Sequence, residues 1–202
     1  MVGRPRKSDP RPDSRSAILE AAAEEFAERG VDGTRMEHVA ARAGFNKALV
    51  YKHFGSREGL FEAVLDAKLA GRQEVLRRLP DTMGEIFVAW SRANLADPSF
   101  FKLIMREALE HRGPEPVRKE DRQAYYRAQI EMVRELQDSG KLPAGLEPKY
   151  LFLALLAVVT LPALLPQIAA LVSDEATDDK AFRDGWHRFL RGFADRLSAP
   201  NQ

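Results

Sequence analysis

The sequence predicts an all-α fold in which a small three-helix domain near the N-terminus precedes a larger helical bundle, with about nine helices in all. Three observations support this prediction. Apolar residues recur at helical spacing along most of the 202-residue chain, Gly and Pro separate these stretches, and no segment shows the alternating pattern of a strand. An apolar content of 45% is enough to fill a core at this chain length.

The first predicted helix covers residues 16–29, where apolar positions recur at helical spacing. Asp13 can cap its start, and Gly30 is a typical stop. A second, short helix is predicted after Thr34, because Thr34-x-x-Glu37 has the form of a capping box. In that motif each side chain accepts a hydrogen bond from the backbone N–H of the other residue.

Gly44 is expected to end the second helix, and Asn46 can cap a third helix over residues 47–54. Val50 and Phe54 lie four residues apart and are expected to face inward. The outer face then carries small, basic and aromatic residues: Lys47, Ala48, Tyr51 and Lys52. Two short helices joined by a Gly-containing turn form a helix-turn-helix, whose second helix can lie in the major groove of DNA.

Six further helices complete the prediction. A long helix capped by Ser56 is expected to run to the residues before Pro80. The remaining five are predicted at residues 82–96, 99–112, 117–139, 148–172 and 178–197. Pro, Gly and Ser-Asp breaks separate them.

Positive charge is local, because the formal net charge of the whole chain is only +1. One basic run is an N-terminal arm, residues 1–13, which is rich in Pro and is expected to lack regular structure. The other, at residues 38–57, has four cationic side chains and no carboxylate: Arg42, Lys47, Lys52 and Arg57. Either run alone is also compatible with an ordinary solvated surface. The chain has no Cys, which excludes disulfides and thiolate chemistry and favours the cytoplasm.

The outer face of residues 47–54 suits double-stranded DNA. Lys47 can donate to guanine and Ala48 can touch a thymine methyl. The residues one turn on, Tyr51, Lys52 and His53, are placed for phosphate or sugar. Thr34 and Arg57 can add backbone contacts from helix N-termini, where free N–H groups favour anions.

The run from Thr34 to Phe61, with Gly44, Tyr51 and Arg57 in place, closely resembles the DNA-binding signature of the TetR family of regulators. The resemblance covers roughly residues 14–62 and implies two groups of contacts. Bases would be approached by Lys47, Ala48 and Leu49, and the DNA backbone would be held by Thr34, Tyr51, His53 and Arg57. Gly59 departs from the family pattern by placing a flexible residue in the first turn of the fourth helix.

The resemblance also implies that residues 63–202 form a C-terminal domain that pairs two subunits through its last two helices and holds an effector pocket. One aromatic stripe on the last helix is the candidate dimer interface: Phe182, Trp186, Phe189, Leu190 and Phe193. Aromatic and polar residues of the earlier helices are the candidate pocket for an apolar or aromatic small molecule: Phe87, Trp90, Phe101, Ile104, Tyr125, Tyr126 and Gln129. Plain core packing is the alternative for both sets.

Residues 151–172 contain no charged side chain over a length that could cross a bilayer. Pro162 and Pro166 interrupt this run, and no basic cluster flanks it. A helix buried by the core and by a partner subunit is therefore preferred to a membrane span. Whether the run lines the pocket or the dimer interface is left open by the sequence.

No catalytic constellation, cofactor motif or metal site is expected. Only Glu107-x-x-x-His111 resembles metal-ligand spacing, and a solvated pair on a helix explains it. The sequence therefore predicts a cytoplasmic, DNA-binding regulator that is not an enzyme. Its expected form is a homodimeric repressor released from a near-palindromic operator by a small-molecule effector. The alternatives are a helix-turn-helix regulator without small-molecule input and, more distantly, a membrane-associated helical protein.

Overall fold

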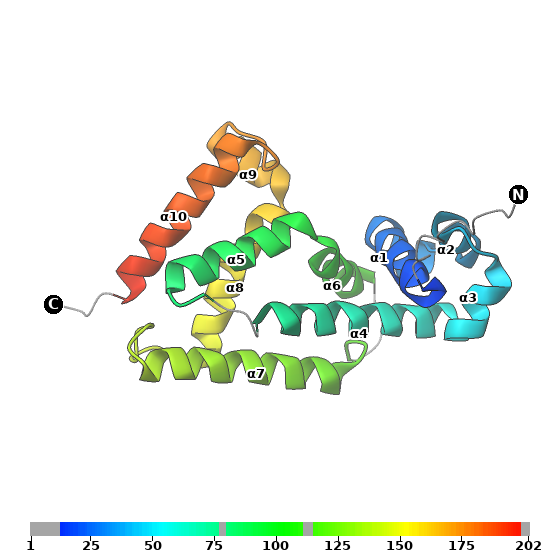
Figure 1. The fold of residues 1–202 in the computed structure, drawn as a ribbon, viewed down its shortest axis with the longest axis horizontal. Helices are drawn as coiled ribbons and strands as arrows, with labels where there is room; N and C mark the ends of the chain where they lie inside the picture. Colours follow the sequence, from blue (N-terminus) through cyan, green and yellow to red (C-terminus); the bar gives the residue numbers. More distant parts are fainter. Residues whose placement is uncertain (1–12, 77–79, 111–114, 199–202) are drawn as a thin grey trace, which may run out of the picture. The chain divides into compact units, whose positions relative to one another are not determined.

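A computed structural model describes residues 13–76, 80–110 and 115–198. This part of the chain contains ten α-helices and no strand, which confirms the all-α prediction (Figure 1). The helices are α1 (Ser14–Gly33), α2 (Met36–Ala43), α3 (Lys47–Phe54), α4 (Arg57–Leu76), α5 (Met83–Ala96), α6 (Ser99–Glu110), α7 (Lys119–Asp138), α8 (Pro148–Leu164), α9 (Pro166–Ser173) and α10 (Lys180–Ser198). The predicted basic arm, residues 1–13, lies almost entirely outside the described residues.

The helices form two compact units. The first contains the described residues up to Lys68 together with Leu103–Val117, and the second contains Leu69–Lys102 and the described residues from Arg118 onwards. Helix α4 therefore begins in the first unit and ends in the second. The sequence carried no signal that the end of α6 would join the N-terminal helices.

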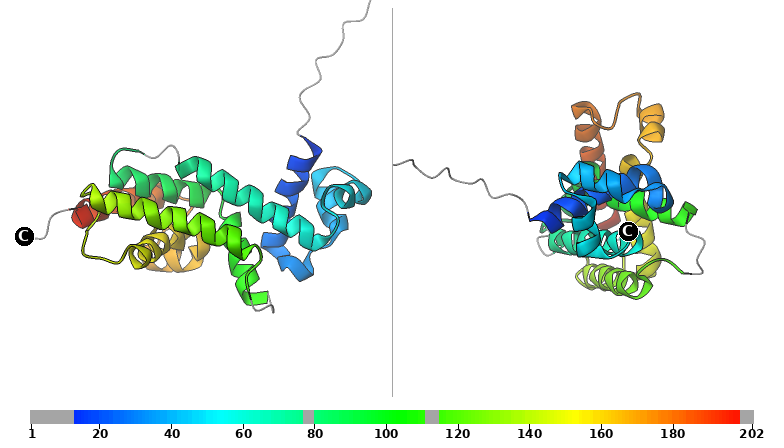
Figure 2. Two further views of the ribbon diagram at one scale, coloured as in Figure 1. Left: turned by 90° about the horizontal axis from the view of Figure 1, so that it is seen from below. Right: turned by 90° about the vertical axis from the view of Figure 1, so that its right-hand side faces the viewer.

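The first unit is built around α1, which packs on α2, which in turn packs on α3 (Figure 2). Their inward residues form one apolar cluster with α4, centred on the fully buried side chains of Phe26, Val39 and Val50. Phe26 meets Phe61 of α4 edge to face, with the ring centroids 5.2 Å apart. This packing fixes which side of α3 faces outward.

Two glycines shape the connections around α3. Gly44 ends α2 in the left-handed conformation, with φ 76°, and Asn46 then caps α3 by accepting the Leu49 N–H at 2.8 Å. Gly59 lies where an added Cβ would come within 2.4 Å of the Phe54 carbonyl oxygen. The glycine in the first turn of α4 is thus required by this close approach and does not mark flexibility.

The predicted capping box at Thr34 is wrong. The N-cap residue of α2 is Arg35, and no side-chain hydrogen bond caps this end of the helix. Thr34 is buried, and its hydroxyl donates to the Gly30 carbonyl at 2.7 Å. Gly30 has non-helical angles, φ 71° and ψ 178°, inside α1. The kink frees a carbonyl group that the Thr34 hydroxyl satisfies, and Glu37 is left to other partners.

In the second unit, α5 packs against both α10 and α8, and α7 packs against α8 (Figure 1). The approach of α5 to α10 is close at Gly84, where an added Cβ would lie 3.2 Å from the Arg191 Cα. Phe87 and Leu190 are fully buried in the resulting core.

The single helix predicted over residues 148–172 is two helices, α8 and α9, bent by 87°. Pro166 starts α9, and Leu165 before it has left the helical region, with φ −126° and ψ 60°. Proline disfavours the helical conformation in the preceding residue, which explains the break. Within the described ranges, no single helix is long and apolar enough to span a membrane, and only this bent pair meets that criterion together.

Candidate DNA-binding surface and ligand cavity

Most of the predicted DNA-contacting residues lie on the outer side of α3. Lys47, Ala48, Tyr51, Lys52 and His53 are exposed. Val50 of the same helix is fully buried, so its side of α3 faces the core while these five side chains remain accessible. We call this set the recognition face.

Lys47 does not project freely from the recognition face. Its ammonium Nζ lies 2.5 Å from the Glu37 Oε1 of α2 and 5.5 Å from the centroid of the Tyr51 ring. The hydrogen bond raises the pKa of Lys47 and lowers that of Glu37. The side chain that the sequence predicts to meet bases is therefore held by an acidic neighbour.

Arg57 at the start of α4 is half-buried and also paired. Its guanidinium donates to the Asp32 carbonyl at 3.1 Å, to the Asp32 carboxylate at 3.2 Å and to Glu58 at 3.2 Å. His53 is linked to α1, with its Nε2 3.1 Å from the Ser14 hydroxyl. Both side chains are thus oriented by neighbours within the first unit.

Arg42 belongs to the basic run of the sequence but not to the recognition face. Its guanidinium binds three carboxylates of α1, those of Glu24, Glu25 and Glu28, at 3.0–3.1 Å. The hydrogen bond from Arg42 also lowers the pKa of Glu28. This cation therefore fastens α2 to α1.

Two other predicted contact residues are only partly accessible or buried. Leu49 packs in part against the apolar cluster of the first unit. Thr34 is 3% exposed, with its hydroxyl committed to Gly30. In this conformation the Thr34 side chain offers no donor to a phosphate.

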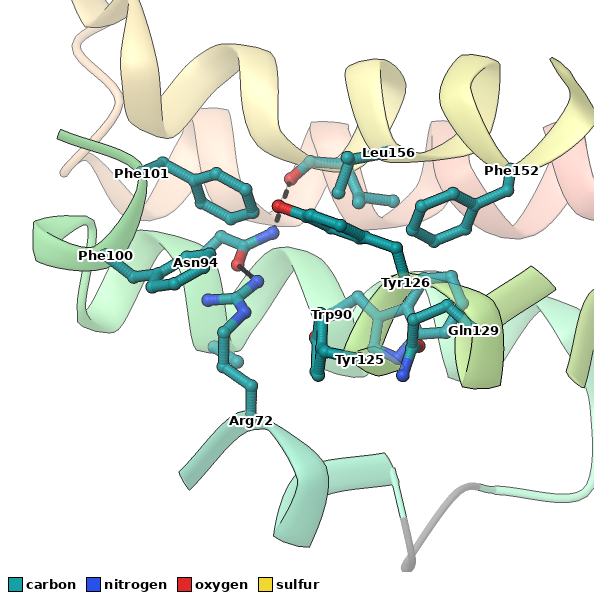
Figure 3. Close-up of a pocket in the computed structure, with 12 residues that line it drawn as sticks. Arg72, Trp90, Asn94, Phe100, Phe101, Tyr125, Tyr126, Gln129, Phe152 and Leu156 are labelled. Carbon is teal, nitrogen blue, oxygen red and sulfur yellow. Dashed lines mark hydrogen bonds between the residues drawn. The ribbon is translucent and has the colours of Figure 1, made fainter. Parts of the chain in front are cut away.

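The second unit encloses a cavity of about 60 Å³ between α4, α5, α6, α7 and α8 (Figure 3). Aromatic side chains make most of its wall, and the lining residues are Arg72, Trp90, Ala93, Asn94, Phe100, Phe101, Tyr125, Tyr126, Gln129, Phe152, Leu156 and Val159. Such a wall, apolar with a few convergent polar groups, is typical of small-molecule sites.

Five of the seven predicted pocket residues line this cavity: Trp90, Phe101, Tyr125, Tyr126 and Gln129. Phe87 is fully buried in the neighbouring core, and Ile104 packs against the apolar cluster of the first unit. Arg72 and Asn94 were not predicted, because they are polar residues on helices in which the apolar positions carry the pattern. Three residues of the uncharged run 151–172, which the sequence does not assign to pocket or interface, also line the cavity: Phe152, Leu156 and Val159.

Arg72 enters the cavity from α4 and is held by neutral partners. Its Nη2 donates to the Asn94 Oδ1 at 2.7 Å, and the Asn94 amide in turn donates to the Val159 carbonyl at 3.3 Å. The guanidinium also lies over the rings of Phe100 and Phe101, 4.8 and 4.3 Å from their centroids (Figure 3). Burial raises the pKa of the nearby Tyr125 hydroxyl, and the positive charge of Arg72 partly offsets this.

The predicted aromatic stripe on α10 is present as a ladder. The rings of Phe182, Trp186, Phe189 and Phe193 follow one another with centroids 6.3, 5.2 and 5.8 Å apart. Phe189 is 52% exposed, whereas Phe182 and Leu190 are buried within the second unit. This burial assigns Phe182 and Leu190 to the core of the subunit and leaves Phe189 as the main accessible member of the stripe.

The metal-like spacing at Glu107 cannot be followed, because His111 lies outside the described residues. Elsewhere in the part of the chain that the structure covers, no group of three or more His, Asp or Glu side chains could hold a metal ion. Glu107 itself accepts the Val117 N–H at 2.7 Å.

Two family models match the chain. The model for bacterial regulatory proteins of the tetR family matches residues 18–64, and the model for the tetracyclin repressor-like C-terminal domain matches residues 84–196. This chain belongs to the TetR family. It is therefore a DNA-binding transcriptional regulator with an N-terminal helix-turn-helix domain and a C-terminal helical domain.

Curated relatives of this TetR-family chain are transcriptional regulators. It is 27% identical over 186 residues to the HTH-type transcriptional repressor SCO4008 of Streptomyces coelicolor, across 91% of this chain and 96% of that protein. It is 33% identical over 107 residues to the HTH-type transcriptional activator FasR of Mycolicibacterium smegmatis, across 51% of this chain and 46% of the activator.

Solved structures share the fold. The putative transcriptional regulator SCO4942 from Streptomyces coelicolor superposes with a TM-score of 0.72 at 25% identity, over 90% of this chain and 98% of that one. AibR, solved in complex with isovaleryl coenzyme A and operator DNA, gives a TM-score of 0.69 at 19% identity, over 94% and 100% of the two chains.

Proposed function

We propose that this TetR-family regulator is a homodimeric repressor that leaves a near-palindromic operator when a small molecule enters the cavity of the second unit. One observation carries the proposal: the same chain has an exposed recognition face on α3 and an aromatic cavity whose wall includes a residue of α4. Since α4 also contributes Phe61 to the apolar cluster of the first unit, one helix takes part in both regions.

On DNA, Lys47 and Ala48 of the first turn of α3 would meet base edges, with Leu49 beside them. Tyr51, Lys52 and His53 would meet phosphate or sugar. Arg57 would hold a phosphate near the N-terminus of α4. Thr34 would approach the DNA only through its main chain, because its hydroxyl donates to the Gly30 carbonyl.

Dimerisation is proposed through the helices at the C-terminal end, α8 and α10. Leu153 and Leu161 of α8 are 58% and 44% exposed, and Phe189 of α10 is 52% exposed. Large apolar side chains that remain exposed on two helices mark a protein interface more often than a free surface. A symmetric pair of subunits would also place two recognition faces on the two halves of a palindrome.

Release by an effector requires that the effector bind two conformations with different affinity. The proposal is supported by AibR, which was solved in complex with isovaleryl coenzyme A and operator DNA. The repressor SCO4008 supports the sign of regulation, whereas the activator FasR makes activation the second candidate.

The deciding experiment is selection of bound duplexes from a random pool by the purified chain, repeated over a series of salt concentrations. We expect a near-palindromic consensus and an affinity that falls steeply with salt, because phosphate contacts release counterions. Binding without any consensus would contradict a specific operator. A reporter gene under the selected site then separates repression from activation.

Sedimentation of the wild type and of Leu153→Asp tests the dimer. A charge placed in an apolar interface is costly to bury, so the variant should be monomeric where the wild type is a dimer. Leu109→Asp is the matched control, because Leu109 is also exposed but lies on α6. Equal dimerisation of wild type and Leu153→Asp would exclude this face of α8.

A further inference from the structure

We propose that the ligand of the second-unit cavity is a carboxylic acid with a flat, apolar body, bound as its anion with Arg72 as the charged anchor. This inference rests on the proposed function, because it names the chemical class of the effector. It adds a charge requirement that neither the family membership nor the apolar wall implies.

The first argument is the charge of Arg72. Among the described residues that line the cavity, Arg72 is the only one with a formal charge, and no carboxylate accompanies it. Its partners in the wall are all neutral: the Asn94 carbonyl oxygen, the Tyr125 hydroxyl and the faces of two phenylalanine rings. Arg72 is partly buried, and a partly buried cation without an anionic partner favours an anionic guest.

The second argument is the geometry of the guanidinium. It has five N–H donors in a planar fork, and the hydrogen bond to Asn94 engages Nη2 only. Asn94 is itself fixed by the Val159 carbonyl, so it holds the fork in place (Figure 3). A planar carboxylate matches such a fork with two parallel hydrogen bonds.

The third argument is that the wall contains other hydrogen-bond donors. The indole N–H of Trp90 is buried and has no hydrogen-bond partner within the described chain. Gln129, which is 5% exposed, adds a side-chain amide to the same wall. An ionised carboxylate accepts hydrogen bonds and donates none, so it complements this set of donors.

The body of the ligand is defined by the remaining wall, which is aromatic: Phe100, Phe101, Tyr126 and Phe152. Flat apolar groups pack well against such rings. The cavity, at about 60 Å³, is smaller than the ~150 Å³ cavity in which an engineered protein holds benzene. A ligand with a ring therefore needs more room than this cavity offers, and movement of wall side chains has to supply it.

Calorimetric titration of the full chain without DNA tests this inference with three acids, benzoate, cinnamate and hexanoate, and with the amide of each. Acid and amide have nearly the same shape, but only the acid is charged at neutral pH. We expect at least one acid to bind about ten-fold or more tighter than its amide, with the flat acids ahead of hexanoate. No binding of any acid at millimolar concentration, or equal binding of acid and amide, would overturn the proposal.

Variants then assign the effect to the anchor. Arg72→Met keeps the length of the side chain and should abolish the preference for acid over amide, whereas Arg72→Lys should keep part of it. Arg127→Met, on the exposed side of α7, is the matched control and should bind like the wild type. If circular dichroism shows that Arg72→Met is unfolded, Gln129→Leu is tested in its place. This variant should weaken the binding of the acid more than the binding of the amide. An unchanged preference in a folded variant would overturn the assignment.

DNA binding is measured separately, so that the two proposals can fail independently. Release of the selected operator by amides but not by acids would support the proposed function and overturn the proposal of a carboxylic acid ligand. Acid binding by a chain that shows no operator would keep the carboxylate site and contradict the proposed function.

Discussion

On the recognition face Lys47 is paired with Glu37, and nearby Arg57 is paired with Asp32 and Glu58, whereas Arg72 in the cavity of the second unit has only neutral partners. Helices differ in the same way in their apolar side chains. Within α1 to α3, which pack around Phe26, Tyr51 is the only large apolar side chain that is exposed, whereas α8 and α10 leave Leu153, Leu161 and Phe189 exposed.

This difference separates a region that is complete by itself from one that is not. In the first unit carboxylates pair with Lys47 and Arg57, so we expect DNA binding to exchange one set of ion pairs for another. The second unit has a cation without an anion, an indole N–H without an acceptor and an uncovered apolar surface. The partners that would complete the second unit are the proposed ligand and a second subunit.

The largest effect is expected from two neighbouring residues of α10. Leu190 is fully buried, so Leu190→Ala should lower the free energy of unfolding by about 2–5 kcal/mol through lost burial and a cavity. Phe189→Ala should lower the stability of the monomer by only about 1 kcal/mol, through lost contacts with Trp186 and Phe193, and should weaken dimerisation instead. Urea unfolding at several protein concentrations measures both. Equal destabilisation by the two changes at every concentration would remove the distinction between core and uncovered surface.

Next in size is Lys47→Ala on DNA. Losing a base contact should weaken binding to the selected operator by roughly ten- to hundred-fold per half-site and relax base preference there. Arg57→Ala is the comparison, since loss of a phosphate contact should weaken specific and random duplexes alike. Competition binding with both duplexes separates the two. A uniform loss for Lys47→Ala would show that the recognition face positions DNA without reading it.

A smaller effect of opposite sign is expected from Glu37→Gln. Removing this carboxylate frees Lys47 and removes a negative charge from the protein surface proposed to bind DNA. The affinity for DNA should therefore rise by a few-fold at low salt. Glu20→Gln on the exposed side of α1 makes the same change of charge elsewhere and should have less effect. Unchanged affinity in Glu37→Gln would mean that the pair does not compete with DNA.

The smallest effect concerns His187 of α10. Burial, followed by the positive charges of Arg92 and Arg191, lowers its pKa below the ordinary value of 6.5, although Asp184 opposes the shift. Glu85 and Arg183 also face it. The folded state thus disfavours the protonated ring, and this contribution to stability is present above pH 6.5 and lost as the pH falls below that value.

Urea unfolding at about pH 8 and about pH 5.5 measures this contribution. The wild type should lose more stability on acidification than His187→Gln, which cannot take up the proton. An identical loss in both proteins would assign the acid sensitivity to other groups.

Local sequence signals predicted the helices well, because caps and breaks depend on neighbouring residues. Asn46 caps α3 and Gly44 ends α2 as expected. A capping side-chain oxygen and a glycine in the left-handed conformation act within a single helical turn, so nearby residues are enough to predict them. The capping box at Thr34 failed for the opposite reason. Its hydroxyl had a competing acceptor at Gly30, and that carbonyl became free only through a kink in α1.

Charge and periodicity predicted candidates but not their partners. The basic run included Arg42, which the fold uses to bind α1, and the aromatic stripe of α10 included Leu190, which packs into the core. In both cases helical spacing gave the face of the helix, but what covers that face depends on residues distant in the chain. Five of the cavity residues were found because aromatic side chains gather around cavities.

The sequence by itself determined the helical fold, the helix-turn-helix and the residues of its outer face, because periodicity, capping and turn glycines act over a few residues. Only the tertiary structure decided that Glu37 holds Lys47, that Arg72 enters an aromatic cavity beside Asn94, and that residues 148–173 bend by 87° and contribute to its wall. Those features join residues that are distant in the chain, such as Asn94 and Val159, which are 65 positions apart. Their energies depend on distance in space and on burial, which no local pattern encodes.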